Sequence, residues 1–120
     1  MSEKSTILVV DDEIGIRELI KSSFDPEDYE VLTASTAEEA LRIVDKQSPR
    51  LVLLDIRLPE MNGIEALERI KKINKDIAVI MITAFGDEKT AIKCTKLGAV
   101  AFVNKPFDVS YIVMLVQNHL

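Results

Sequence analysis

The sequence has little of what disulfide-stabilised, nucleic-acid-binding and membrane proteins depend on. It contains one cysteine, Cys94, so an internal disulfide is excluded and a reducing, cytoplasmic location is the natural expectation. It has no excess of cations, because 15 Lys and Arg stand against 20 Asp and Glu, a net charge of −5. Direct nucleic-acid binding needs clustered cations and is therefore not expected. The first apolar run, 7–10, is too short for a signal-peptide core or a membrane span, so no membrane association is expected.

What is present indicates one ordered domain. The chain of 120 residues suits a single domain, 1–120, and leaves little room for a second. A chain of this size buries about two thirds of its unfolded surface when it folds. Hydrophobic residues make up 48% of the sequence, which is too many for a disordered chain.

Five apolar runs alternate with segments of helical spacing. The runs are bounded by turn-forming or charged residues and predict strands at 7–10, 29–34, 51–55, 77–83 and 100–104. After each run, apolar residues recur every three or four positions, which predicts helices beginning near 14, 37, 64, 91 and 109. This alternation favours an α/β fold with a doubly wound, five-stranded parallel sheet. The flavodoxin-like strand order 2-1-3-4-5 fits best, because it places the more polar second strand at an edge.

Some residues mark where helices begin and end. Ser35 and Glu38 fit a capping box, which predicts that Ser35 is the N-cap of the second helix. Residues 84–87 form a predicted loop after the fourth strand. Asp108 is the expected cap of a last helix that runs to Leu120.

Polar residues stand at the carboxyl ends of four predicted strands. Asp55 ends the apolar run 51–55, and Asp11 and Asp12 follow the first strand. Thr83 ends the fourth strand, and Lys105 follows the fifth. Each of these residues alone could be a helix cap, an ordinary strand residue or a solvated charge. In the predicted strand order all five converge on one crevice, where such folds bind their ligands.

The chemistry of this set indicates phosphoryl transfer. Three neighbouring carboxylates repel one another and raise one another's pKa values unless a cation intervenes. Mg²⁺ suits an open site of oxygen ligands and usually binds through one or two carboxylates plus phosphate oxygens. Asp55 is the best placed nucleophile and would form an acyl phosphate. Lys105 would pair with one phosphoryl oxygen, and the Thr83 hydroxyl would donate to another.

These residues lie in motifs at the spacing of a known family. Over nearly its whole length, the sequence resembles the receiver domains of two-component response regulators, which have the CheY-like form of the flavodoxin-like fold. The motifs that carry the resemblance are VVDDE at 9–13, LLDIRLP at 53–59, NG at 62–63, TA at 83–84, GA at 98–99 and KPF at 105–107.

The resemblance implies a phosphoacceptor and a metal site. By this likeness, Asp55 accepts a phosphoryl group from a sensor histidine kinase or a histidine phosphotransfer protein. Asp11, Asp12 and Asp55 would hold Mg²⁺ together with the backbone carbonyl of Arg57, and Mn²⁺ or Ca²⁺ can take its place. A receiver is a phosphoacceptor rather than an enzyme, since it catalyses only its own phosphorylation and dephosphorylation.

The resemblance also implies a conformational switch. Thr83 and Phe102 would be the switch pair, and Lys105 would bind the phosphoryl group. The bond between Lys105 and Pro106 is often cis in the family. Phosphorylation would change the surface formed by the fourth helix, the fifth strand and the fifth helix, and a partner would respond to that change.

Two contexts are compatible with a receiver. The likeness extends to the single-domain response regulators of the sporulation phosphorelay, although Phe102 stands where those regulators have a histidine. We therefore expect a stand-alone phosphorelay protein, and the alternative is a receiver domain excised from a larger transcriptional regulator. A small-molecule phosphatase would need a cap domain, and a flavodoxin-like cofactor carrier would need a phosphate-binding loop where the acidic 11–13 stands.

The last helix offers a candidate contact surface. Residues 109–116 are apolar nearly all round, so one face would be outside if the helix covers a sheet. Tyr111, Val113 or Met114 would then contribute to a homodimer or partner face beside the fourth helix, unless the helix is wrapped by the core. Cys94 lies on the apolar stripe of the fourth helix and is expected to be buried rather than redox-active.

Overall fold

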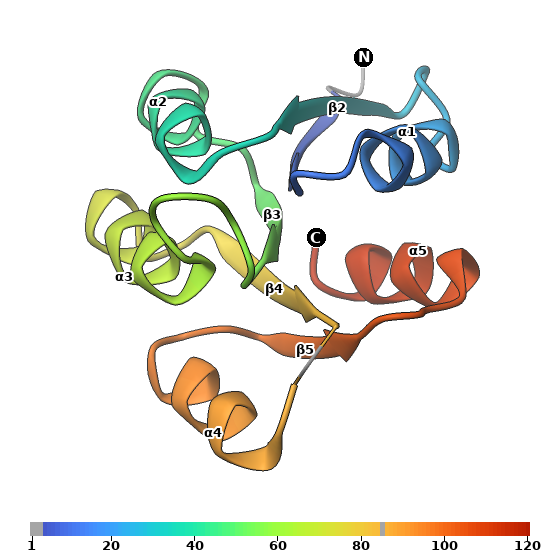
Figure 1. Ribbon diagram of the computed structural model, residues 1–120. Helices are drawn as coiled ribbons and strands as arrows, with labels where there is room; N and C mark the ends of the chain where they lie inside the picture. Colours follow the sequence, from blue (N-terminus) through green and yellow to red (C-terminus); the bar gives the residue numbers. More distant parts are fainter. Residues whose placement is uncertain (1–3, 85) are drawn as a thin grey trace.

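The computed structural model describes residues 4–84 and 86–120 (Figure 1). Within these residues, strands and helices alternate along the chain. The strands are β1 (Ser5–Val10), β2 (Tyr29–Ala34), β3 (Leu51–Asp55), β4 (Ala78–Thr83) and β5 (Ala101–Asn104). The helices are α1 (Ile14–Ser22), α2 (Ala37–Gln47), α3 (Gly63–Ile73), α4 (Glu88–Lys96) and α5 (Val109–Asn118).

The strands form one parallel sheet in the order β2-β1-β3-β4-β5. This confirms the predicted doubly wound α/β fold and the position of the polar strand β2 at an edge. Helices α1 and α5 lie on one side of the sheet, and α2, α3 and α4 lie on the other (Figure 1). Because β2 lies on one side of β1 and β3 on the other, the direction in which strands are added to the sheet reverses between β1 and β3. The carboxyl ends of these two strands border the crevice that such sheets use for ligands.

The core consists of two apolar layers, one on each face of the sheet. All residues of β3 are buried, as its continuous apolar sequence predicts for a strand covered on both faces. Each fully buried Leu or Ile stabilises the fold by about 1.5–3 kcal/mol relative to an exposed side chain. This core fixes β3 firmly in the sheet, and with it the position of Asp55 at the strand's end.

The predicted capping box is wrong by one residue. Thr36 is the N-cap of α2, and its hydroxyl accepts a hydrogen bond from the Glu39 backbone N–H at 3.2 Å. The Glu39 carboxylate in turn accepts from the Ser35 backbone N–H at 2.9 Å. Because Thr36 and Glu39 have the same spacing as Ser35 and Glu38, the sequence pattern does not separate the two registers. The observed register places both Glu38 and Glu39 in the first turn, where the helix dipole stabilises them.

Other boundaries differ by one to three residues, the largest difference being α4, which begins at Glu88 rather than near 91. β4 and β5 each begin one residue later than predicted, at Ala78 and Ala101. α5 ends at Asn118 rather than Leu120, because His119 leaves helical geometry. Asp108 caps α5 as predicted, since its carboxylate accepts from the Ser110 backbone N–H at 3.0 Å. Of the predicted loop 84–87, Phe85 lies outside the described residues.

Candidate functional site

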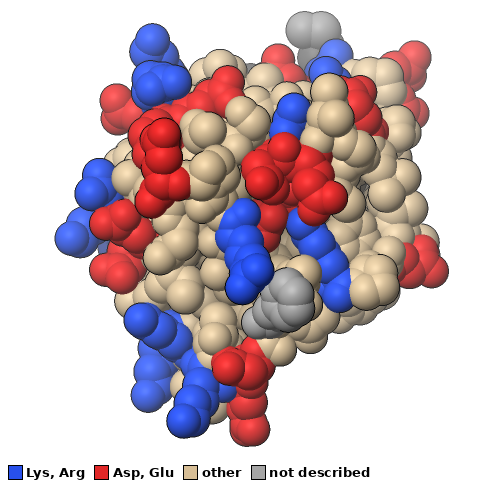
Figure 2. Space-filling model, in the orientation of Figure 1, with Lys and Arg blue, Asp and Glu red and all other residues tan. Residues whose placement is uncertain are grey.

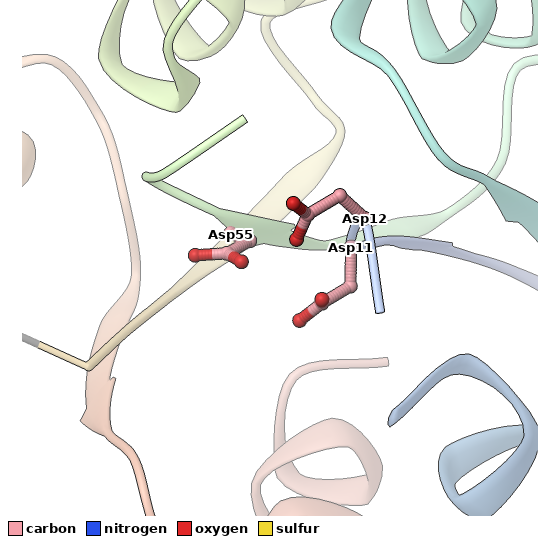
Figure 3. Close-up of side chains that lie close together, drawn as sticks. All are labelled: Asp11, Asp12 and Asp55. Carbon is pink, nitrogen blue, oxygen red and sulfur yellow. The ribbon is translucent and has the colours of Figure 1, made fainter. Parts of the chain in front are cut away.

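The carboxyl ends of the strands bring together the residues that the sequence singled out. Asp55 is the last residue of β3, Thr83 is the last residue of β4, and Asp11 and Asp12 directly follow β1. Lys105 follows β5. In Figure 3 the three aspartates converge from two neighbouring strands, and each of them has a carboxylate oxygen within 4.8 Å of the others. The predicted convergence is therefore present for the three aspartates, and Lys105 contacts two of them.

A glycine allows the chain to turn sharply after Asp55. The loop after β3 returns so closely that the Gly63 backbone N–H donates to the Ile56 carbonyl at 2.8 Å. A Cβ atom added to Gly63 would collide with the Asp55 carbonyl oxygen and would lie 2.7 Å from the Ile56 Cα. Asn62 then begins α3, because its side chain accepts from the backbone N–H groups of the next turn. The close approach of α3 to the end of β3 thus depends on the missing side chain of Gly63.

Hydrogen bonds from the local backbone orient the two buried carboxylates. One oxygen of Asp11 accepts from the Glu13 backbone N–H at 2.9 Å. Asp55 Oδ1 accepts from the Arg57 backbone N–H at 3.1 Å. The Arg17 guanidinium holds the same region from α1, donating to the Asp11 carbonyl at 2.8 Å. The second oxygen of each carboxylate accepts a hydrogen bond from Lys105 Nζ.

The electrostatics of Asp55 are those of a buried acid beside a second acid. Asp11 and Asp55 are almost fully buried, whereas Asp12 is exposed. Burial raises the pKa of Asp55, and the neighbouring Asp11 raises it further. The Arg57 backbone hydrogen bond and Lys105 act in the opposite direction, but the pKa of Asp55 remains above its ordinary value. This is the repulsion that a bound cation would relieve.

Lys105 bridges the acidic cluster. Its Nζ lies 2.8 Å from Asp11 Oδ2 and 3.2 Å from Asp55 Oδ2. The same Nζ lies 3.3 Å from Glu13 Oε1. Burial on its own would lower the pKa of Lys105, but the hydrogen bonds and charges of Asp11 and Asp55 outweigh it and raise the pKa above its usual value. Lys105 is therefore a permanent ammonium in contact with the carboxylates.

The two predicted switch residues lie on the neighbouring strands β4 and β5. Thr83 is buried, and the open pocket is lined by its neighbour Ala84 rather than by Thr83 itself. Phe102 lies in β5, half-buried and packed against the core on the α2, α3 and α4 side. Its ring also lies so close to Gly86 that a Cβ atom there would collide with it. The Lys105 backbone N–H donates to the Thr83 carbonyl at 2.8 Å, which ties the two strand ends together.

The pocket above the cluster is polar and open. Its volume is about 390 Å³, and it is lined by Asp12, Glu13, Asp55, Arg57, Ala84 and Lys105. Figure 2 shows acidic side chains gathered over the middle of this face, with basic side chains next to them. A larger groove of about 630 Å³ lies between α2 and α3, but it does not include any of the predicted site residues. The chemistry therefore points to the smaller pocket.

The composition of this pocket suits a small hard cation. Aspartate oxygens are the ligands that Mg²⁺ prefers, and the open face leaves room for the waters that it keeps. Arg57 lies two residues after Asp55 and lines the same pocket, as a carbonyl ligand from this loop would have to. The Lys105–Pro106 bond is cis, as the resemblance led us to expect.

Sequence reasoning missed two residues of the site. Glu13 was seen only as part of a motif, and its contact with Lys105 spans 92 residues of sequence. Arg17 was seen only as a polar position on the first helix, whereas its guanidinium binds the Asp11 carbonyl. A helical-wheel argument could have placed Arg17 one turn after the acidic loop. No local signal could have paired Glu13 with Lys105.

A fold and a site of this kind define a class of protein. A comparison with protein-family models matches residues 7–117 to the response regulator receiver domain. The chain belongs to this family, whose members are phosphoacceptors. Its relatives include both stand-alone proteins and parts of larger regulators.

Among curated proteins, the sporulation initiation phosphotransferase F of Bacillus subtilis is 43% identical over 100% of this chain and 95% of its own length. The probable transcriptional regulator ycf27 of Cyanophora paradoxa is 43% identical over 88% of this chain, which spans 44% of that protein. The regulatory protein AtoC of Escherichia coli is 35% identical over all of this chain, which spans 26% of AtoC.

The solved structures agree. The CheY-like receiver domain protein of Methanospirillum hungatei has a TM-score of 0.91 and 31% identity, covering 97% of this chain and 93% of that chain. Chemotaxis protein CheY4 of Vibrio cholerae has a TM-score of 0.90 and 26% identity, covering 98% and 100%. Across the part of the chain that the structure describes, none of the helices has the length and apolar character needed to span a membrane.

Proposed function

We propose that Asp55 is the phosphoacceptor of a phosphorelay. Its carboxylate accepts a phosphoryl group from a phosphohistidine of a sensor histidine kinase or of a histidine phosphotransfer protein. The observation that carries this proposal is the contact of Lys105 Nζ with both Asp55 and Asp11, beside a cluster of three aspartates. A nucleophilic carboxylate, a fixed cation and a candidate metal site are thereby within a few ångströms of one another.

The transfer follows from these positions. A carboxylate oxygen of Asp55 forms a bond to phosphorus while the bond between phosphorus and the histidine nitrogen breaks, and that nitrogen keeps the electron pair. The product is an aspartyl phosphate. Lys105 donates a hydrogen bond to one phosphoryl oxygen, and its contact with Asp55 Oδ2 at 3.2 Å supports this role. The protein catalyses only its own phosphorylation and dephosphorylation and acts on no separate substrate.

The proposed cofactor is Mg²⁺, which Mn²⁺ or Ca²⁺ can replace. Asp11, Asp12 and Asp55 would hold it, together with the backbone carbonyl of Arg57. When bound, the ion supplies positive charge that offsets the carboxylates and the incoming phosphoryl group. The raised pKa of Asp55 supports this proposal, because burial and then the nearby charge of Asp11 disfavour its ionised form, and a bound cation would offset both.

The proposed response is a population shift between two arrangements of the same fold. The Thr83 hydroxyl is drawn to the phosphoryl group, and Phe102 moves into the space that opens. The half-buried state of Phe102 and the close packing of its ring against Gly86 support this motion, because the ring already lies at the loop that follows Thr83.

The changed surface would be the one formed by α4, β5 and α5. Apolar side chains with 42–48% of their surface exposed lie on these elements and on the turn before β5. They are Ile92, Val100, Tyr111 and Met114. Exposed apolar side chains are candidates for contact with a partner where they form a patch. We propose that a homodimer or a downstream protein covers them.

The chain as a unit, 1–120, is proposed to act alone in the cytoplasm, without binding nucleic acid or membranes. The match to nearly the whole length of a phosphotransferase supports a stand-alone relay protein over a receiver excised from a transcriptional regulator. Phosphotransfer profiling tests this. Each ³²P-labelled histidine kinase and phosphotransfer protein of the host is mixed with the wild type and with Asp55→Asn. The wild type should become labelled and Asp55→Asn should not. The labelled wild type should then pass its label to a phosphotransfer protein. Label on Asp55→Asn would refute the acceptor.

A further inference from the structure

Glu13 occupies the N-cap position of α1 but its side chain does not cap the helix. Ser, Thr, Asp and Asn are favoured at this position, because their short side chains accept hydrogen bonds from the first turn. The Glu13 carboxylate instead lies 3.3 Å from Lys105 Nζ, across the mouth of the pocket. The side chain therefore interacts with the site rather than with its own helix.

The contact matters because the hydrogen-bonding capacity of Lys105 is limited. A lysine ammonium has three N–H donors. Lys105 contacts Asp11, Asp55 and Glu13, so all three donors are committed to carboxylates. A phosphoryl oxygen can accept a hydrogen bond from Lys105 only after one of these contacts is released.

The three carboxylates are not equivalent in this competition. The side chains of Asp11 and Asp55 are 2% and 4% exposed, and both belong to the aspartate cluster. The Glu13 side chain is 63% exposed and belongs to the rim. Its bond to Lys105 is therefore the one that solvent weakens most. Among the described residues, it is also the contact of the Lys105 ammonium that the proposed metal and phosphoacceptor roles leave unexplained.

We propose that Glu13 is a positioning residue that restrains Lys105 and so slows the phosphorylation of Asp55, while its charge strengthens Mg²⁺ binding. This inference rests on the proposed function of Asp55. With acetyl phosphate as donor, a carboxylate oxygen of Asp55 bonds to phosphorus, the bond from phosphorus to the acetyl oxygen breaks, and acetate leaves with the electron pair. Glu13 takes no part in these bonds and acts only through the availability of Lys105 and the local charge.

Two substitutions separate the contact from the charge. Glu13→Gln removes the charge and keeps the length of the side chain. Glu13→Asp keeps the charge, but its carboxylate is one methylene shorter and suits the N-cap, so it no longer reaches Lys105. Glu18→Gln is the matched control, because Glu18 is an exposed glutamate on the same helix that lines a different pocket. It changes the net charge of the protein by the same amount.

The test measures two quantities for each protein. The Mg²⁺ dissociation constant is measured by calorimetry, and the rate of phosphorylation by acetyl phosphate is measured by intact mass at saturating Mg²⁺. An exposed ion pair corresponds to a factor of about 1.5 to 5. Glu13→Gln should phosphorylate about 2- to 5-fold faster and bind Mg²⁺ about 2- to 5-fold more weakly. Glu13→Asp should be faster by a similar factor with unchanged Mg²⁺ affinity, and Glu18→Gln should match the wild type in both.

Other results would overturn the proposal. If both Glu13 variants phosphorylate at the wild-type rate, the contact does not restrain Lys105. If Glu13→Gln is faster but Glu13→Asp is not, the effect is charge repulsion of the donor and not the contact. Equal changes in Glu18→Gln would make it an effect of net charge. A wild type that is never phosphorylated would instead refute the role of Asp55, which keeps the two failures apart.

Discussion

The replacement Gly63→Ala tests whether the close approach of α3 to β3 holds the site together. The added Cβ would collide with the Asp55 carbonyl oxygen, and it would lie 2.7 Å from the Ile56 Cα and 2.9 Å from the Asp55 carbonyl carbon. All three atoms belong to the backbone, so no side-chain rotation relieves the contact. α3 and the end of β3 must therefore move apart.

The expected loss follows from the cost of overpacking. Forcing a methyl group into a packed site destabilises a protein by about 1–3 kcal/mol, out of a total stability of about 5–15 kcal/mol. Urea unfolding followed by circular dichroism measures this loss. Because the displaced atoms are those of Asp55 and its neighbour, the variant should also be phosphorylated more slowly than the wild type at equal folded fraction.

Gly15→Ala is the matched control. No described atom lies within 4 Å of the Cβ that it would add, and Gly15 lies in the exposed first turn of α1. Here alanine should be neutral or should stabilise the protein by up to about 1 kcal/mol, because it restricts the unfolded chain and favours the helix. The reasoning fails if Gly63→Ala is as stable as the wild type, or if Gly15→Ala loses as much.

Three further predictions concern charge and capping. Thr36→Ala should reduce the free energy of unfolding by about 0.5–2 kcal/mol, whereas Ser35→Ala should have little effect in the same urea titrations, because Thr36 is the observed N-cap. Burial and Asp11 raise the pKa of Asp55, so the folded state holds this proton to a higher pH than the unfolded chain, whose value is about 3.9. The stability that protonated Asp55 contributes is present below that value and is lost as pH rises through the folded pKa. In EDTA, Asp55→Asn should therefore become progressively more stable than the wild type as pH rises from acidic to neutral. A difference in stability that stays constant with pH would contradict this. Mg²⁺ at 100 times its dissociation constant should stabilise the wild type by about 2.7 kcal/mol in thermal unfolding, and Asp12→Asn at the same concentration should gain much less.

The sequence was enough to predict the strand order and the convergence of the site. Both depend on strong signals, namely five apolar runs separated by helical spacing and polar residues directly after those runs. Parallel strands bring their carboxyl ends to one edge whatever the details of packing. The positions of Asp11, Asp55 and Lys105 relative to one another therefore followed from topology alone.

The finer features depended on choices that a local pattern does not decide. Ser35 with Glu38 and Thr36 with Glu39 are overlapping versions of the same capping signal, and the structure adopts the second. The contact between Glu13 and Lys105 joins residues that are 92 positions apart in the sequence. Thr83 ends β4 and is buried, whereas the next residue, Ala84, lines the open pocket.

The central claim is that Asp55 accepts a phosphoryl group with the help of a metal ion. Intact-mass spectrometry after incubation with acetyl phosphate, with and without Mg²⁺, tests it most directly on the wild type and Asp55→Asn. The account predicts a gain of one phosphoryl group that requires both Mg²⁺ and Asp55. No gain in the folded wild type at saturating Mg²⁺, or an equal gain in Asp55→Asn, would contradict it.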